Sequence, residues 1–450
     1  MKVAQNQGES LGQRAKRGAR WTVIGIALTS VIRLASNLIM TRLLVPEAFG
    51  MIALASTIMT AINLSTDMGI ARSVTREPDG DTKLFLRMAW MVKMLRSALI
   101  AGAILALAAL MWLLAPGLAP AGTIYAQPEM PGLIALIALA PICRGMGSAN
   151  WELALRNIDR RSIVIWTVLP LMVSILAMIA FAQISPTVWA LMFGMLTNFL
   201  VQSLATHLFF PGPRMKFVWD KEIGDRLWHF GKWIMGSSFL SFVSRNADKF
   251  VLGALLGSAT FGLYVIAQIW VEAGRNLIKK IGDGIGYPVI AEVARTRPED
   301  LVRLYRRFQY RIDALCLAAC AAAVVGGPII VDLLYTDTYQ QAGHLLQLMA
   351  FSFLVLRFST LSNLVLTAGN SRAMLTVSAI LAVVSVTLMA LGYRFYGLDG
   401  AVLGVVLAPL SPLPYLLYLV HPMLGTKEVR IEALWGGAIL VAIPVGFWVL

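Results

Sequence analysis

Two arginines occupy matching positions within two apolar stretches of this chain. Residues 20–50 align without a gap with residues 232–262, and the alignment places Arg33 opposite Arg245. An arginine in the middle of a membrane-spanning helix costs roughly 2.5–3.5 kcal/mol on insertion scales, so it is a functional candidate by default. A guanidinium group binds phosphate through paired hydrogen bonds. The repeat therefore predicts an anion site to which both halves of the chain contribute.

The repeat extends to a second pair of apolar stretches and brings in more cations. With one inserted residue between the two matches, Arg144 lies opposite Arg357. Guanidinium groups facing a common water-filled cavity would suit a ligand with several negative charges, such as a diphosphate. We therefore expect a cationic substrate-binding cavity lined by Arg33, Arg144, Arg245, Lys249, Arg275 and Arg357.

Three acidic residues accompany these cations. Asp67 lies on a polar helix face, and Glu272 lies on the matching face in the second half. Asp248 lies between Arg245 and Lys249. These carboxylates could hold arginines in place when the site is empty, or one of them could bind and release a proton or a sodium ion to drive transport. We expect no other cofactor and no metal site.

Each of these residues also has a purely structural interpretation. An arginine could pair with a carbonyl or a carboxylate inside one half of the chain without any ligand. Arg245 could pair with Asp248, which lies one turn away in the same helix. Asp67 could simply lie at the cytoplasmic end of its helix. The sequence leaves these alternatives open.

Long apolar segments must position these side chains. Of the 450 residues, 58% are hydrophobic and 14% charged, whereas soluble domains contain about 25% charged residues. Thirteen stretches approach the roughly 20 residues that a helix needs to cross a bilayer, and none shows the alternation of a barrel strand. They lie near 20–43, 50–71, 88–114, 132–152, 163–183, 187–210, 233–256, 260–278, 312–334, 343–368, 373–393, 398–420 and 431–450.

We therefore predict an all-α integral membrane protein. Its two six-helix transmembrane bundles would be related by a pseudo-twofold axis along the membrane normal, because an even number of spans before the repeat restarts gives both halves the same orientation. One extra C-terminal segment would follow them. The expected divisions are a cytoplasmic N-terminal tail (1–19), an N-lobe (20–210), a cytoplasmic basic linker (211–232), a C-lobe (233–420) and the extra transmembrane segment (421–450).

Lysines and arginines are concentrated in alternate connections between the apolar stretches. Beyond the N-terminal tail, they gather near residues 72–87, 156–161, 214–226 and 279–307. This positive-inside pattern predicts a cytoplasmic N-terminus and explains the net charge of +14 without a nucleic-acid partner. The arginine-rich stretch 292–311 is expected to form an interfacial helix on the inner leaflet.

Several motifs resemble a known family of membrane proteins. The segments RGARW, TRLLVPEAFGMIALA and DMGIARSVTRE, and later SRNADKFVLGALLGSATFGLYVIA, are similar to polysaccharide transporters of the multidrug/oligosaccharidyl-lipid/polysaccharide exporter superfamily, the lipid-linked oligosaccharide (Wzx-like) flippases. The resemblance implies alternating access and a cationic cavity for the diphosphate and sugars of an undecaprenyl-diphosphate-linked oligosaccharide. It also implies a role in exopolysaccharide or O-antigen (lipopolysaccharide) biosynthesis at the bacterial inner membrane. By position, it assigns Arg33, Arg245 and Lys249 to the cavity.

Two other functions remain as alternatives. A drug/cation antiporter of the same superfamily would favour a cavity of carboxylates and aromatics. A membrane polysaccharide polymerase or ligase would need catalytic groups in a long external loop, but residues 115–131 offer only Glu129, so we expect no enzyme activity. The expected partners are a lipid-linked glycan and membrane lipids, with polysaccharide polymerase machinery as a further candidate, and we expect a monomer.

Overall fold

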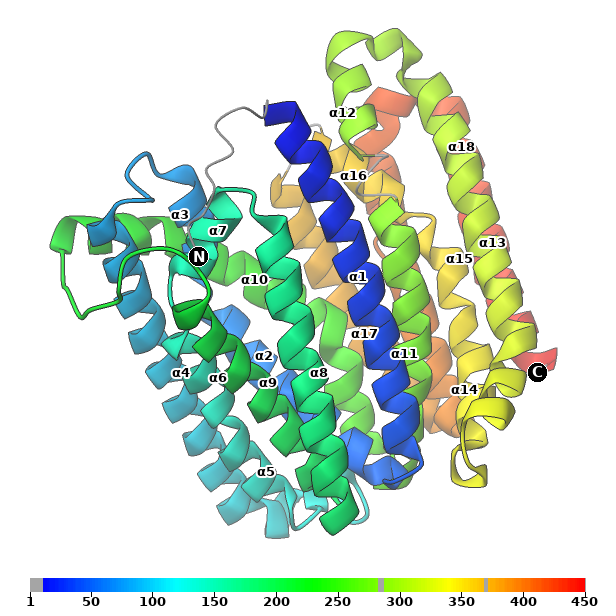
Figure 1. Cartoon of the computed structure of the whole chain (residues 1–450). Coiled ribbons are helices and arrows are strands. Elements are labelled where there is room, and N and C mark those ends of the chain that lie inside the picture. Colours follow the sequence, from blue (N-terminus) through cyan, green and yellow to red (C-terminus); the bar gives the residue numbers. More distant parts are fainter. Residues whose placement is uncertain (1–10, 282–286, 368–370, 450) are drawn as a thin grey trace. The chain divides into compact units, whose positions relative to one another are not determined.

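The computed structural model describes residues 11–281, 287–367 and 371–449, and their regular structure is helical apart from one isolated bridge between Thr123 and Gly257 (Figure 1). Helices suit a lipid environment because each one satisfies its own backbone hydrogen bonds. Residues 1–10 of the expected N-terminal tail lie outside the described ranges. The rest of that tail is already helical, since α1 begins at Leu11.

Eight helical stretches in the described ranges are long and apolar enough to cross a membrane, or nine if one bent pair counts as a span. The thirteen expected stretches are not all recovered, for two reasons. Helices α10 (Lys221–Leu255) and α11 (Ser258–Ile281) carry charged residues that reduce their apolar character. The last stretch, Ala373–Trp448, counts once although it runs through several helices.

The chain divides into two compact units. The first unit comprises Met1–Ala119 and Tyr125–Phe239, and the second comprises Pro120–Ile124 and Leu240–Leu450. The division lies inside α10, beyond the expected linker 211–232. The first part of that linker is not helical, and the rest of it opens α10.

The helices of the first unit include a pair that is bent at a short break. They are α1 (Leu11–Thr41), α2 (Pro46–Ser65), α3 (Ile70–Arg76), α4 (Lys83–Leu118), α5 (Met130–Ile137), α6 (Leu139–Met146), α7 (Asn150–Arg156), α8 (Arg160–Ile184), α9 (Val188–Leu208) and the first part of α10. The stretch Met130–Met146 meets α7 at an angle of 60°. At this break the backbone N–H of Ser148 donates to Thr206 Oγ1 (2.7 Å), so a freed backbone group keeps a partner.

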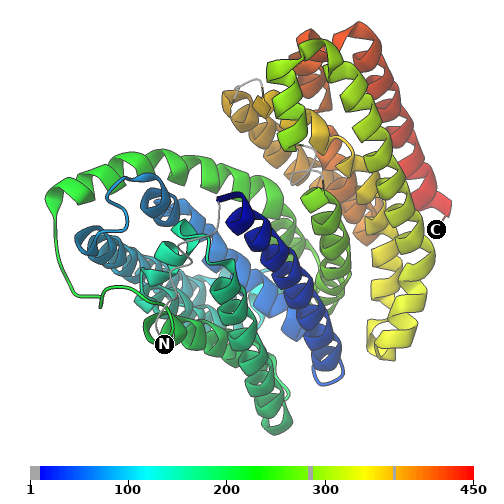
Figure 2. The same cartoon turned by 45° about the horizontal axis from the view of Figure 1, so that its top comes forward.

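The second unit contains two long helices that are interrupted by glycines. Its elements are the rest of α10, α11, α12 (Tyr287–Thr296), α13 (Leu301–Leu334), α14 (Gln341–Ala350), α15 (Ser352–Leu356), α16 (Ser359–Thr367), α17 (Ser371–Leu407) and α18 (Leu413–Val449). Gly397 (φ 60°) breaks α17 and Gly425 (φ 78°) breaks α18. Glycine adopts positive φ without steric cost, so each of these positions can join two helices across a kink. Helices α13 and α18 lie side by side (Figures 1 and 2).

The arginine-rich stretch 292–311 differs from its expected structure. Helix α12 ends at Thr296, and α13 then runs without a break from Leu301 to Leu334. At 1.5 Å per residue, its 34 residues extend about 51 Å, more than the roughly 30 Å of a hydrocarbon core. The prediction of a separate interfacial helix is therefore wrong, because residues 301–311 continue an apolar helix.

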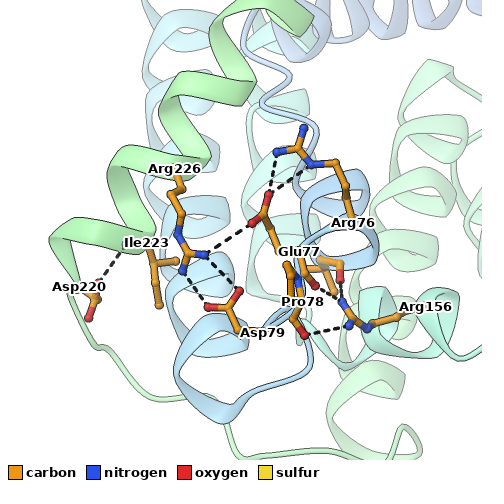
Figure 3. Close-up of polar contacts among 9 residues, drawn as sticks. Arg76, Glu77, Pro78, Asp79, Arg156, Asp220, Ile223 and Arg226 are labelled. Carbon is orange, nitrogen blue, oxygen red and sulfur yellow. Dashed lines mark hydrogen bonds and ion pairs between the residues drawn. The ribbon is translucent and has the colours of Figure 1, made fainter.

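A cluster of ion pairs fixes the connection between α3 and α4 (Figure 3). Arg226 on α10 donates to both carboxylate oxygens of Asp79, at 3.2 and 2.7 Å, and lies 3.5 Å from Glu77. Arg156 on α7 donates to the backbone carbonyls of Glu77 and Pro78. The connection is thus held from two helices, both within the first unit.

Replacing Asp79 should weaken this connection in a pH-dependent way. The hydrogen bond from Arg226 holds the pKa of Asp79 below its ordinary value of 3.8. Because the folded pKa is lowered, the stabilisation is complete above the unfolded pKa and is lost as the pH falls through the folded pKa. Both side chains are about one-third exposed, so Asp79→Asn should cost only about 0.2–1 kcal/mol at pH 7.

Thermal unfolding of the purified protein, followed from pH 7 to pH 3, measures this effect. Asp81→Asn is the matched control, because Asp81 is exposed in the same connection and forms no ion pair with the described residues. The melting temperatures of Asp79→Asn and wild type should converge at the acid end. Equal melting temperatures at pH 7 would show that the pair contributes nothing.

Candidate functional site

Each unit contains a polar pocket of its own. The first-unit pocket encloses about 330 Å³ at the break between α6 and α7. Its charged lining residues are Asp67, Lys93, Arg96, Arg144 and Glu152. The second-unit pocket encloses about 230 Å³, and its charged lining residues are Arg245, Asp248, Glu272, Arg275 and Lys279. Counting the described residues, three cations and two anions line each pocket.

Two guanidinium groups in the first-unit pocket form no hydrogen bond or ion pair with a carboxylate of the described residues. Arg144 lies over the ring of Phe199, with Cζ 5.4 Å from the ring centroid, and forms no hydrogen bond with the described residues. Arg96 donates to the backbone oxygen and the Oδ1 of Asn63, both at 3.0 Å, and to Thr66 Oγ1 at 3.2 Å. These partners are neutral, and Asp67 of the same pocket interacts with Arg96 electrostatically without a hydrogen bond, so both guanidinium groups can still donate to an anion.

The carboxylates of this pocket are held differently. Glu152 Oε1 lies 3.2 Å from Lys93 Nζ, while Glu152 Oε2 is buried without a hydrogen-bond partner in the described part of the chain. Asp67 Oδ1 accepts a hydrogen bond from the backbone N–H of Gly69 at 3.1 Å. The structure therefore brings Asp67 and Arg144 to one pocket, together with cations that the sequence analysis did not select.

The second-unit pocket gathers most of the expected second-half residues. Asp248 is buried and accepts hydrogen bonds from Tyr264 (2.6 Å) and Gln268 (2.7 Å). Arg275 lies 3.7 Å from Glu272, one turn away. Arg245 donates to the hydroxyl of Ser241 at 2.7 Å. Hence the alternative of an intrahelical pair between Arg245 and Asp248 is not realised.

Three predicted site residues lie outside both pockets, and one of them, Arg357, lies in a separate buried environment. Arg33 is exposed on α1. Lys249 donates to Asn246 Oδ1 at 3.3 Å and does not line the second-unit pocket, although Arg245 and Asp248 on the same helix do. Their assignment to a substrate site stays a prediction.

Arg357 lies in a buried ion cluster. It donates to both oxygens of Asp313, at 2.8 and 3.0 Å, and to Glu432 at 2.8 Å. The rings of Phe358 and Trp435 flank its guanidinium group at 4.9 and 5.0 Å. With only 4% of the residue exposed, this environment favours the structural interpretation that the sequence left open. The match between Arg144 and Arg357 therefore does not extend to their partners.

The sequence analysis missed five charged residues in these two environments. They are Lys93, Arg96, Glu152, Asp313 and Glu432. A signal was available, because each of them lies within a stretch that had been recognised as apolar. Four of them lie outside the stretches in which the repeat is recognised, and Glu152 lies within one of these stretches but opposite the apolar Val365.

Comparison with known proteins identifies relatives in polysaccharide biosynthesis. Residues 39–344 match the family model for a polysaccharide biosynthesis protein. The succinoglycan biosynthesis transport protein ExoT of Rhizobium meliloti is 20% identical over 319 residues, which are 70% of this chain and 60% of the relative. The lipopolysaccharide biosynthesis protein WzxC of Escherichia coli is 19% identical over 345 residues, 76% of this chain and 67% of the relative. The match thus leaves about two-fifths of ExoT uncovered.

Solved structures identify the fold. An inward-facing multidrug resistance MATE family transporter of the MOP superfamily matches with a TM-score of 0.64 at 15% identity, over 92% of this chain and 99% of that one. The lipid II flippase MurJ in an inward closed conformation matches with a TM-score of 0.63 at 13% identity, over 95% of this chain and 97% of that one. At these identities the likeness concerns the fold alone.

Proposed function

This chain belongs to the polysaccharide biosynthesis protein family, and we propose that it is a flippase. Its substrate would be an undecaprenyl-diphosphate-linked oligosaccharide repeat unit, which it translocates across the bacterial inner membrane by alternating access. The product would serve exopolysaccharide or O-antigen biosynthesis. The roles that the names of ExoT and WzxC state, in succinoglycan biosynthesis transport and in lipopolysaccharide biosynthesis, support this substrate class.

The observation that carries the proposal is the presence of guanidinium groups without carboxylate partners in polar pockets. Among the described residues, Arg96, Arg144 and Arg245 are hydrogen-bonded only to neutral groups or to none. Arg144 and Arg245 are exposed and Arg96 is half-buried, so an anion that enters either pocket can reach their donors. A diphosphate carries the matching negative charge and accepts the paired hydrogen bonds that guanidinium donates. We further propose that Arg33, Lys249 and Arg275 contact the substrate.

The remaining features of the proposal follow from the repeat. Two six-helix bundles would alternate access to the substrate by a rocking motion. The N-terminus would lie in the cytoplasm, and the part of α18 after Gly425 would form an additional span. Coupling to a proton or sodium ion would fall to Asp67, Asp248 or Glu272. Membrane lipids and polysaccharide polymerase machinery are the proposed partners of a monomer.

A drug/cation antiporter fits these pockets less well, although the fold is shared with a MATE transporter. Each pocket is lined by three cations and two anions, so each repels a cationic drug. An enzyme is disfavoured by the composition of the longest connection expected outside, whose only charged residue is Glu129.

Deletion of the gene tests the proposed function. The expected result is that a lipid-diphosphate oligosaccharide accumulates with its glycan on the inner leaflet, while the exported polymer disappears. Labelling of intact and opened vesicles with a glycan-binding lectin locates the intermediate. Complementation with the wild-type gene should restore export. Normal polymer export in the deletion strain, without accumulation, would contradict the proposal.

A further inference from the structure

The first-unit pocket contains a lysine–glutamate pair beside two unpaired guanidinium groups. We propose that Glu152 is the counter-anion of the empty pocket: it forms an ion pair with the ammonium group of Lys93 until a phosphate-bearing ligand replaces it. Glu152 then tunes how tightly the pocket holds its ligand. The inference rests on the proposed function for the identity of the anion. It assigns roles to Lys93, Arg96 and Glu152.

Glu152 is held weakly for a buried carboxylate. Its side chain is 10% exposed, and its single ion pair spans 3.2 Å, longer than the 2.7–2.9 Å typical of charge-assisted hydrogen bonds. Oε2 has no hydrogen-bond partner among the residues that the structure describes. By contrast, two hydrogen bonds hold Asp248, and Arg357 engages both oxygens of Asp313. A carboxylate left half-satisfied is costly, so Glu152 is the easiest of the three to displace from its cation.

The pocket offers a phosphate group more donors than Glu152 uses. Arg144 has free donors over Phe199, and Arg96 is bound to neutral groups only. Further polar side chains complete the lining, namely Ser97, Gln202, Ser203 and Thr206. A phosphate bound to Arg144 would lie in the same pocket as Glu152, and the two negative charges repel each other. Lys93 would therefore transfer from the carboxylate to the phosphate.

The position of the pocket also suits a transport site. It lies at the break between α6 and α7, and the α7 residues Trp151 and Glu152 form part of its wall. Interrupted helices at membrane depth persist where they line a cavity, and they often border substrate sites. A transporter must release its ligand as well as bind it. A resident carboxylate promotes release because it competes for the same cation.

Titration of the purified full-length protein with inorganic pyrophosphate, followed by isothermal calorimetry, tests the inference. An Arg245→Gln/Arg275→Gln background removes two cations of the second-unit pocket. In this background Glu152→Gln should bind pyrophosphate about threefold to tenfold more tightly, because Lys93 is freed and one repulsive charge is lost. Arg144→Gln should bind at least about tenfold more weakly.

Two further variants make the outcome decisive. Glu129→Gln removes an exposed carboxylate of the same unit outside the pocket and should leave the affinity unchanged. Lys93→Met should weaken binding, since Glu152 then repels the anion without a counter-charge, and adding Glu152→Gln should restore it. This rescue keeps the inference testable even where Glu152→Gln alone unfolds.

An unchanged or weaker affinity in folded Glu152→Gln would overturn the role of Glu152. If Arg144→Gln still loses binding in that case, the anion site and the proposed function stand without it. A starting background that binds no pyrophosphate would overturn this inference, whereas the flippase proposal would still be judged by the deletion strain.

Discussion

Arg144→Gln and Arg245→Gln should each reduce glycan export about tenfold to a hundredfold while the protein still folds and inserts. Each substitution removes charged hydrogen bonds to the substrate, worth about 1.5–3 kcal/mol each. Neither arginine forms an ion pair with a described carboxylate, so its replacement leaves no carboxylate without a counter-charge. The expected phenotype is therefore a functional defect at normal protein abundance.

Complementation of the deletion strain measures this effect as polymer yield and as accumulated lipid-linked intermediate. Arg303→Gln is a suitable control, because this side chain is 89% exposed on α13 and lines neither pocket. Lysine at position 144 or 245 should recover part of the activity, since it keeps the charge but not the paired donors. Wild-type export by both glutamine variants would show that the pockets do not bind the substrate.

The fold could be predicted from apolar patterning, although its breaks could not. The stretch 132–152 reads as one continuous span, yet it bends by 60° between α6 and α7. At the bend the backbone N–H of Ser148 donates to Thr206 Oγ1, which lies on a different helix. Hydrophobic periodicity contains no information about such a distant partner.

The candidate site could be predicted where the repeat aligns polar positions of the two halves. Arg245 lies opposite Arg33 and Glu272 lies opposite Thr60, and both Arg245 and Glu272 line the second-unit pocket. Glu152 lies opposite the apolar Val365, so the repeat could not reveal it. A repeat reports equivalent backbone positions, whereas function depends on the partners that each side chain meets.

Arg357 illustrates this limit and provides the largest expected effect on stability. All four carboxylate oxygens of Asp313 and Glu432 accept hydrogen bonds. Arg357 donates to three of these oxygens, and Tyr305 donates to the fourth. Gln309 adds a further hydrogen bond to Asp313. A fully satisfied buried network of this kind fixes the packing of α13 against α18 and the α15–α16 region.

Arg357→Ala should therefore lower the stability of the protein by about 3–5 kcal/mol, because it leaves two buried carboxylates without a counter-charge. Replacing the whole cluster, in Arg357→Met/Asp313→Asn/Glu432→Gln, should recover most of this loss, since no unpaired charge remains. Denaturant unfolding of the purified protein in detergent measures both. Arg144→Ala is the matched control and should cost far less, because no carboxylate depends on it. A stable Arg357→Ala variant that fails to export glycan would instead return Arg357 to the substrate site, where the repeat had placed it.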